Sequence, residues 1–152
     1  MSIKETILAD LKTAMKQKEK DRLRVLRSLK AKLLEKEISE RKGGEGSLND
    51  EQTIEVLMKA AKQRKESIEQ FEKGGRDDLA DNERQELTII EAYLPEMLTE
   101  EEIRDFVKEK IEGLNAESMA DMGPVMGAVM PQLKGKAEGS IVSRVVKEEL
   151  SQ

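Results

Sequence analysis

Apolar side chains recur every three or four residues along almost the whole chain, and no stretch alternates apolar and polar residues with period two. Spacings of three and four place side chains on one face of an α-helix, whereas a half-buried strand requires alternation. Apolar residues make up 37% of the chain and charged residues 39%. That balance suits helices with broad solvated faces better than a two-sided sheet. The sequence therefore predicts an all-α protein.

Four amphipathic helices are expected in an N-terminal domain of residues 1–94, where they form two antiparallel pairs. Polar or glycine-rich breaks at residues 16–20, 43–47 and 74–75 separate them. The expected starts are Ser2 with Glu5 as a capping box, Asp21, Asn49 or Ser47 as a cap, and Asp77. The apolar positions expected to face the core include Met15, Leu26, Leu29, Leu33 and Ile38 in the first pair, and Leu57, Ala61 and Ile90 in the second.

A domain boundary is expected at Tyr93–Glu96. Pro95 disfavours the helical conformation of the residue before it and cannot continue the preceding helix. A second capping box, Thr99 with Glu102, follows at once and opens a three-helix C-terminal domain of residues 95–152. The remaining two helices are expected to run from Met122, capped by Asp121, to a stop at Pro131, and from a start near Glu138.

Missing residue types exclude several classes of active site. The chain has no histidine, cysteine or tryptophan. A Ser-His or Cys-His nucleophile, a zinc site built on His or Cys, an iron–sulfur cluster and a disulfide are therefore impossible within it. Paired carboxylates such as Glu83 and Glu86 stand in strongly polar stretches, which do not shift a pKa as catalysis requires. No catalytic residue, metal ligand or cofactor is assigned.

The N-terminal residues do not have the form of a targeting segment. They become acidic within five residues and lack an apolar run, so neither a signal peptide nor a membrane span is expected. A cytoplasmic location is the expectation, with no membrane or DNA partner.

Charge is distributed unevenly within the net charge of −5. Between Lys12 and Lys42, twelve Lys and Arg stand against five Asp and Glu, whereas residues 95–121 hold three against nine. A solvated helix face is the simplest interpretation of one basic cluster. A binding surface for an anionic partner such as RNA is the more specific interpretation. The candidate contacts to RNA or a partner in this region are Lys16, Lys18, Lys20, Arg22 and Arg24.

The segment 122–131 departs from the charged background. It has no charged residue, and glycines at 123 and 127 and methionines at 122, 126 and 130 recur four apart. Each glycine costs a helix roughly 1 kcal/mol against alanine. Either a close helix crossing within the chain or the close approach of another macromolecule is therefore expected at Gly123 and Gly127. Core filling is the simpler interpretation of the methionine stripe.

Two lysines follow on a glycine-containing loop. Lys134-Gly135-Lys136 lacks the upstream glycine, the following Ser or Thr and the preceding strand of a Walker motif. The adjacent helix N-terminus favours a phosphate, although Glu138 at the expected cap competes for the same N–H groups. Contact of these two lysines with an RNA backbone or with another partner is therefore the remaining hypothesis. The candidate residues in this part of the chain are Met126, Gly127, Lys134, Gly135 and Lys136.

Three strings carry a resemblance to a known family. They are Lys62-Gln63-Arg64-Lys65-Glu66-Ser67, Glu91-Ala92-Tyr93-Leu94-Pro95-Glu96-Met97-Leu98, and Asp121-Met122-Gly123 through Gly139-Ser140. From about residue 3 to Leu150 the chain resembles the YqeY family, also called GatB/YqeY-domain proteins. The resemblance implies an all-helical N-terminal domain and a three-helix tail similar to the tail domain of the B subunit of glutamine-dependent tRNA amidotransferase.

In that larger enzyme the corresponding region approaches the outer corner of the tRNA, while a separate cradle performs the phosphorylation and amidation. The resemblance implies kinship with carbon–nitrogen ligases that use glutamine as amido-N-donor. This chain has no room for the cradle, so no amidotransferase activity is expected from it alone. A translation-associated accessory module that binds tRNA or another structured RNA is one expectation. A protein-interaction module that grips a translation-related protein through Met122, Met126 and Gly127 is the other.

Overall fold

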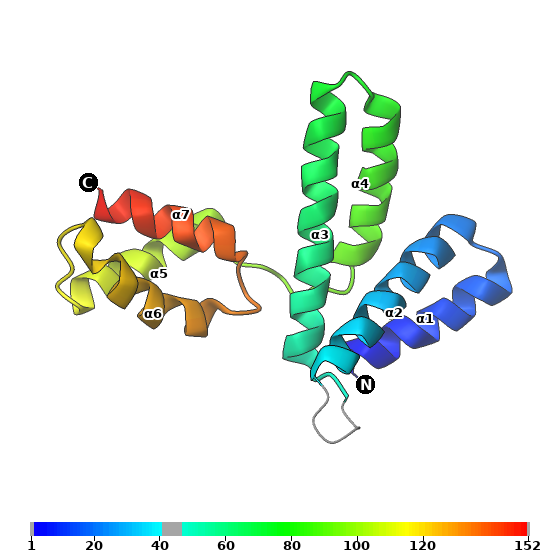
Figure 1. The fold of residues 1–152 in the computed structure, drawn as a ribbon, viewed down its shortest axis with the longest axis horizontal. Helices are drawn as coiled ribbons and strands as arrows, with labels where there is room; N and C mark the ends of the chain where they lie inside the picture. The colour runs from blue at the N-terminus through cyan, green and yellow to red at the C-terminus, as the bar shows by residue number, and fades with distance from the viewer. Residues whose placement is uncertain (1, 41–46, 152) are drawn as a thin grey trace. The chain divides into compact units, whose positions relative to one another are not determined.

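The computed structural model describes residues 2–40 and 47–151. Within these residues the chain forms seven α-helices and one short 3-10 helix, and no strand is found among them (Figure 1). The all-α prediction is therefore confirmed. The expected glycine-rich turn falls mostly on residues 43–46, which lie outside the described residues.

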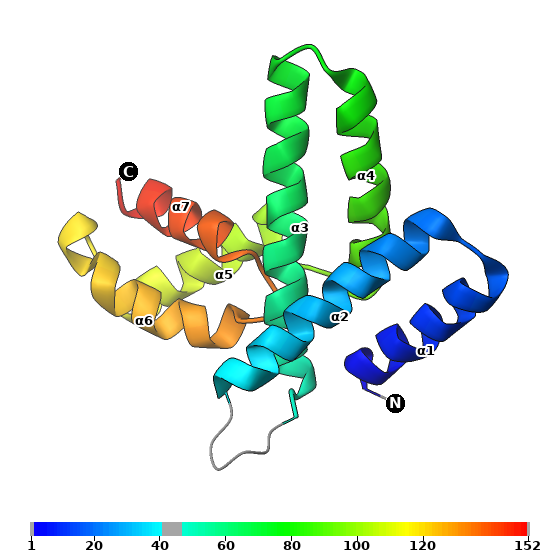
Figure 2. The same ribbon diagram turned by 45° about the vertical axis from the view of Figure 1, so that its right-hand side comes forward.

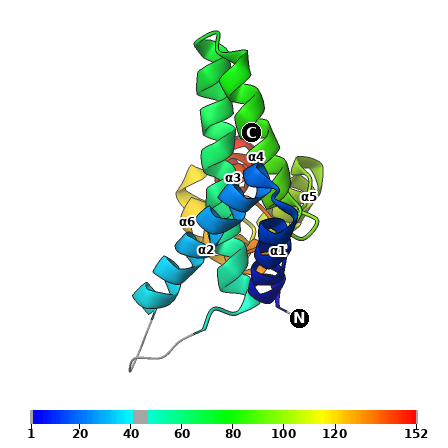
Figure 3. The same ribbon diagram turned by 90° about the vertical axis from the view of Figure 1, so that its right-hand side faces the viewer.

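The chain divides into two compact units, Met1–Leu94 and Pro95–Gln152. The first unit contains α1 (Ile3–Gln17), α2 (Lys20–Glu40), α3 (Asp50–Lys73) and α4 (Asp77–Glu91). Helices α1 and α2 form one antiparallel hairpin and α3 and α4 form another (Figure 2). Figure 3 shows α3 and α4 still side by side when the ribbon is turned further. Independent folding of the two units as domains stays a prediction.

Three of the expected helix starts are closed by reciprocal side-chain bonds. Ser2 Oγ accepts from the Glu5 N–H at 3.1 Å, and the Glu5 carboxylate accepts from the Ser2 N–H at 3.0 Å. Asn49 caps α3 in the same way with Gln52, and Thr99 caps the fifth helix with Glu102. Each cap satisfies backbone N–H groups that a helix start would otherwise leave unpaired, and contributes about 1 kcal/mol.

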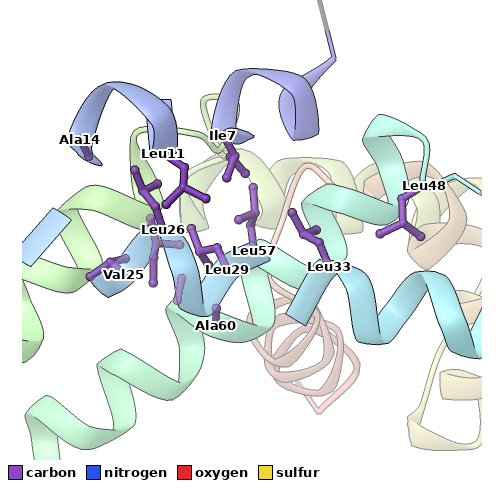
Figure 4. Packing of buried hydrophobic residues seen from close by; sticks show 12 residues of the cluster. Ile7, Leu11, Ala14, Val25, Leu26, Leu29, Leu33, Leu48, Leu57 and Ala60 are labelled. Carbon is purple, nitrogen blue, oxygen red and sulfur yellow. The ribbon is translucent and has the colours of Figure 1, made fainter. Parts of the chain in front are cut away.

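The core of the N-terminal unit draws side chains from all four helices. Ile7 of α1, Leu26 and Leu29 of α2, Leu57 of α3 and Ile90 of α4 are all at most 1% exposed. Figure 4 labels the first four of these side chains, which come from α1, α2 and α3, and shows them converging. Burial of each such side chain stabilises the fold by about 1.5–3 kcal/mol.

The predicted buried stripe of α2 is wrong at its C-terminal end. Ile38 is 57% exposed, and the neighbouring Glu37 is buried in its place. The stripe through Leu29 and Leu33 continues at a spacing of four, which reaches Glu37 because a helix makes one turn in 3.6 residues. Burial of this carboxylate is compensated by an ion pair with Lys4 of α1. Met15 of α1, also expected inside, is 52% exposed.

The C-terminal unit contains α5 (Glu100–Gly113), the 3-10 helix η1 (Met119–Asp121), α6 (Met122–Leu133) and α7 (Gly139–Leu150). Its core consists mainly of β-branched side chains, with Leu133, Ala137 and Leu150 also buried. The fully buried members are Ile103 and Val107 of α5, Val125 and Val129 of α6, and Val142, Val145 and Val146 of α7.

Two predictions about α6 are wrong. The Asp121 carboxylate does not cap α6, because it accepts instead from the N–H groups of Glu117 at 2.9 Å and Ser118 at 3.3 Å, which closes the preceding turn. Pro131 does not stop the helix, which continues to Leu133. The proline lies in the last turn with its ring exposed, so it removes only the bond to the carbonyl of Gly127 four residues earlier.

Candidate nucleic-acid interface

The loop that carries Lys134 and Lys136 has a backbone held by several hydrogen bonds. The N–H groups of Lys136 and Ala137 donate to the Leu133 carbonyl at 2.9 and 3.0 Å. Gly135 has a φ of 77°, a conformation that favours glycine. Leu98, upstream of α5, donates its N–H to the Lys136 carbonyl at 2.9 Å. Both lysine side chains are therefore presented to solvent from a constrained loop.

The start of α7 differs from the sequence expectation at Glu138. This residue occupies the cap position, but its side chain forms no capping bond to the helix backbone. Its carboxylate accepts instead from the Ser140 hydroxyl at 3.2 Å. The expected competition of this carboxylate for the first N–H groups of α7 is therefore absent.

The outer face of α6 is open. A Cβ atom added at Gly123 or at Gly127 would meet no other part of the described chain within 4 Å. The close helix crossing expected at these glycines therefore does not occur, since both face solvent. Met122, Met126 and Met130 are partly buried and pack against the core of the unit.

The surface of α6 also carries no charge, although residues 95–152 hold seven Lys and Arg against twelve Asp and Glu. Several acidic side chains of the unit are paired elsewhere. Arg104 binds Glu148 and Glu149, each at 2.6 Å, and Arg144 binds Glu148 at 3.0 Å. Hydrogen bonds from Arg104 and then Arg144 lower the pKa of Glu148. The outer face of α6 is thus neutral, and the two loop lysines lie just beyond its C-terminal end.

The basic run of the N-terminal unit divides into two kinds of residue. Lys16, Lys18 and Lys20 are exposed around the turn between α1 and α2, and form no ion pair within the described part of the chain. Arg22 lies 3.5 Å from Asp10 and Arg24 lies 3.1 Å from Glu86. Of the five candidate residues in this run, the three lysines are therefore presented without a carboxylate partner among the described residues, whereas the two arginines are paired.

Tyr93 connects this basic region to the end of α4. Its hydroxyl donates to the Asp10 carboxylate at 2.6 Å, and Asp10 also faces Arg22. Burial, followed by the hydrogen bond to Asp10, raises the pKa of Tyr93. The hydrogen bond to Tyr93 raises the pKa of Arg22. No sequence signal indicated this cluster, because its members lie far apart along the chain.

A groove between α2 and α3 is a second feature that the sequence reasoning missed. It contains Lys32, whose ammonium donates to the Gln63 amide oxygen at 3.1 Å. Gln63 belongs to one of the strings that carry the family resemblance, but nothing in that string identified Lys32 as its partner.

The ten predicted contact residues fall into two sets, one in each unit. Lys16, Lys18, Lys20, Arg22 and Arg24 belong to the N-terminal unit, and Met126, Gly127, Lys134, Gly135 and Lys136 to the C-terminal unit. Residues 2–40 and 47–151 contain no group of three or more acidic side chains placed to hold a metal ion. Nor does any helix in these ranges have the length and apolar character needed to cross a membrane.

Comparison with known proteins adds an independent line of evidence. Residues 4–150 match a family model described as Yqey-like protein. A Pyrenophora tritici-repentis protein named "Altered inheritance of mitochondria protein 41, mitochondrial" is 34% identical over 143 residues, which cover 92% of this chain and 76% of the relative. A protein of the same name from Eremothecium gossypii is 39% identical over 85 residues, 56% of this chain and 45% of the relative.

A shorter match connects the chain to a different protein. One subunit of the "Glutamyl-tRNA(Gln) amidotransferase" of Methanobrevibacter smithii is 48% identical over 48 residues. This segment covers 32% of this chain and 8% of that larger protein. The likeness therefore concerns a small part of the relative.

Proposed function

The chain belongs to the YqeY family, and from that premise we propose that it is an RNA-associated accessory module whose C-terminal unit contacts tRNA or another structured RNA. The observation that carries the proposal is the outer face of α6. Its glycines leave space for a close approach at Gly123 and Gly127. The partial likeness to an amidotransferase component named for tRNA supports the same class of partner.

The mode of binding in this proposal is recognition of shape and phosphate. Sequence-specific readers of single-stranded RNA stack bases on exposed aromatic rings. Here Phe71, Phe106 and Tyr93 are all partly buried, and they are the only aromatic residues. A neutral helix face bordered by Lys134 and Lys136 instead lets an RNA backbone lie close while the two ammonium groups reach its phosphates.

A tRNA titration at several salt concentrations tests this proposal. Replacing both Lys134 and Lys136 by alanine should flatten the slope of log K against log salt by about one to two, since each phosphate contact contributes about 0.7–0.9. Gly127→Leu should weaken binding at every salt concentration without unfolding the chain, because the space around a Cβ atom at this exposed position is open and a bulkier side chain there blocks a close approach. The matched control replaces the exposed Lys108 and Lys147 of the same unit by alanine. An equal change of slope in that control, or no change in any variant, contradicts the proposal.

A protein partner on the same face is the second candidate function. The acidic excess of residues 95–152 favours it, because a net negative unit repels RNA at long range. Pull-down of the full chain from its own cells, with and without nuclease, separates the two candidates. A protein that is retained after nuclease and lost in Gly127→Leu favours the protein partner.

No amidotransferase activity is proposed for the chain alone, since no nucleophile or nucleotide loop can be assigned to it. Incubation of the pure protein with glutamine, ATP and Glu-tRNA or Asp-tRNA should form neither Gln-tRNA nor Asn-tRNA. Sustained product, free of contaminating amidotransferase, would end this interpretation.

We also propose a cytoplasmic location for this chain. The names of the relatives from Pyrenophora and Eremothecium place those two proteins in mitochondria instead. Fluorescence imaging of the tagged chain in its own cells decides between the two compartments.

A further inference from the structure

The groove between α2 and α3 has a volume of about 420 Å³. Lys32 and Lys36 lie on its α2 side, and Lys59 and Gln63 lie on its α3 side. Each pair is four residues apart, a spacing that places both side chains on the same face of a helix. Val56 and Ala60 add an apolar part to the lining. The volume is within the range of small-ligand sites.

Two of the ammonium groups in this groove have no carboxylate partner among the described residues. Lys32 is half-buried, and the hydrogen bond described for its ammonium is to the neutral amide of Gln63. Lys59 is exposed and forms no ion pair with residues 2–40 or 47–151. Two positive charges therefore border the same hollow without being neutralised.

The neighbouring cations are different in this respect. Lys36 forms an ion pair with Glu40 at 2.8 Å, and Arg64 forms one with Glu86 at 2.9 Å. The contrast shows that α2 and α4 supply carboxylates to other cations, while Lys32 and Lys59 form no ion pair with the described residues.

The electrostatic surroundings of Lys32 favour a bound anion. Burial, followed by the positive charges of Arg64 and Lys59, lowers the pKa of the Lys32 ammonium, and Glu35 acts in the opposite direction. A cation in this environment is stabilised by an anion placed beside it. The lining also contains the carboxylates of Glu35 and Glu55, so that, with Lys36 paired to Glu40, two lysines stand beside two acids; neither of these carboxylates forms an ion pair with Lys32 or Lys59.

We propose that the α2–α3 groove binds a phosphate group, which accepts hydrogen bonds from the ammonium groups of Lys32 and Lys59. Because the amide oxygen of Gln63 accepts from Lys32, the amide N–H₂ of the same side chain is left as a further donor. The phosphate can belong to a small molecule or to an RNA backbone, and the chemistry that binds it is the same. The inference does not require the RNA proposal, since the groove lies wholly in the N-terminal unit.

An NMR titration of the full chain with inorganic phosphate, AMP and tRNA, each at constant ionic strength, tests this site. Backbone amides of α2 and α3 along the groove should shift saturably, and the pKa of Lys32, followed through its ¹³Cε resonance, should rise when phosphate is present. Lys59→Gln should weaken the affinity about tenfold or more, the loss expected for a hydrogen bond between charged groups. Lys65→Gln is the matched control, because it removes the same charge from an exposed position of α3 outside the groove lining.

The three probes distinguish the source of the phosphate. Saturation by inorganic phosphate or AMP supports a small-molecule site, and shifts caused by tRNA alone support a backbone site. In either case Lys59→Gln must lose affinity and Lys65→Gln must keep it. An absence of saturable shifts with all three probes, or equal affinity of Lys59→Gln and the parent, overturns the proposal. Gly127→Leu should leave the phosphate titration unchanged, so failure of this site and failure of the α6 surface are separable.

Discussion

Replacing Gly127 by alanine should stabilise the C-terminal unit. Gly127 lies in the middle of α6, where alanine is favoured over glycine by about 1 kcal/mol. Apart from the neighbouring residues and the local backbone of α6 itself, no described atom lies within 4 Å of the added methyl group, so no packing cost offsets that gain. The expected change is therefore an increase of about 1 kcal/mol in the free energy of opening.

Hydrogen exchange in the full chain measures this change within the unit itself. A gain of about 1 kcal/mol corresponds to about fivefold slower exchange of the core amides, such as those of Val129 and Val145. Gly135→Ala is the control in the same unit. Its φ of 77° is strained for alanine, so exchange should become faster by a similar or larger factor.

The two glycine variants should therefore move in opposite directions. Faster exchange in Gly127→Ala would show that the outer face of α6 is not open at this position, and would remove the observation on which the proposed surface rests. Unchanged exchange in both variants would show that these amides do not report on the opening of the unit.

Three further results are expected. Tyr93→Phe should cost about 1.5 kcal/mol, the low end for a hydrogen bond to a charged group, because Tyr93 is partly exposed. Because the folded pKa of Tyr93 is raised, this stabilisation is complete below about pH 10 and is lost as the pH rises through the folded pKa. Absorbance at 295 nm follows the titration of this sole tyrosine. Lys4→Ala should lower the urea-derived stability by about 3 kcal/mol, because the buried Glu37 loses its partner, whereas Lys12→Ala on the exposed side of α1 should change it by less than about 0.5 kcal/mol. Limited proteolysis should release a stable fragment that ends at residues 93–96, and a resistant piece of residues 48–152 would contradict that division.

Helix starts could be predicted because their signals are local. Ser2, Asn49 and Thr99 each find their capping partner three residues later, within one turn of the same helix. The end of the buried stripe of α2 could not be predicted in this way. The spacing of four from Leu33 reaches Glu37, but the apolar residue type favoured the neighbouring Ile38, because the Lys4 that compensates the buried carboxylate lies 33 residues earlier in the chain.

The residue types of the candidate site could be predicted from the sequence, but the ion pairs and hydrogen bonds around them could not. The basic run and the loop lysines are visible in the sequence, but the engagement of Arg24 depends on Glu86, 62 residues away. The groove was missed for the same reason, since Lys32 and Gln63 lie 31 residues apart. For Gly127 the sequence shows the helical cost of a glycine and cannot show that the space beside it faces outward.

The hydrogen bond from the Leu98 N–H to the Lys136 carbonyl determines where an expressed fragment of the C-terminal unit should begin. A fragment that begins at Thr99 retains α5, α6 and α7 together with the first helix cap, yet it deprives the lysine loop of this donor. A fragment that begins at Met97 keeps the donating amide within the chain. The N-terminal border of the unit is thus defined by a residue that lies outside every helix, and excision experiments on the loop lysines depend on including it.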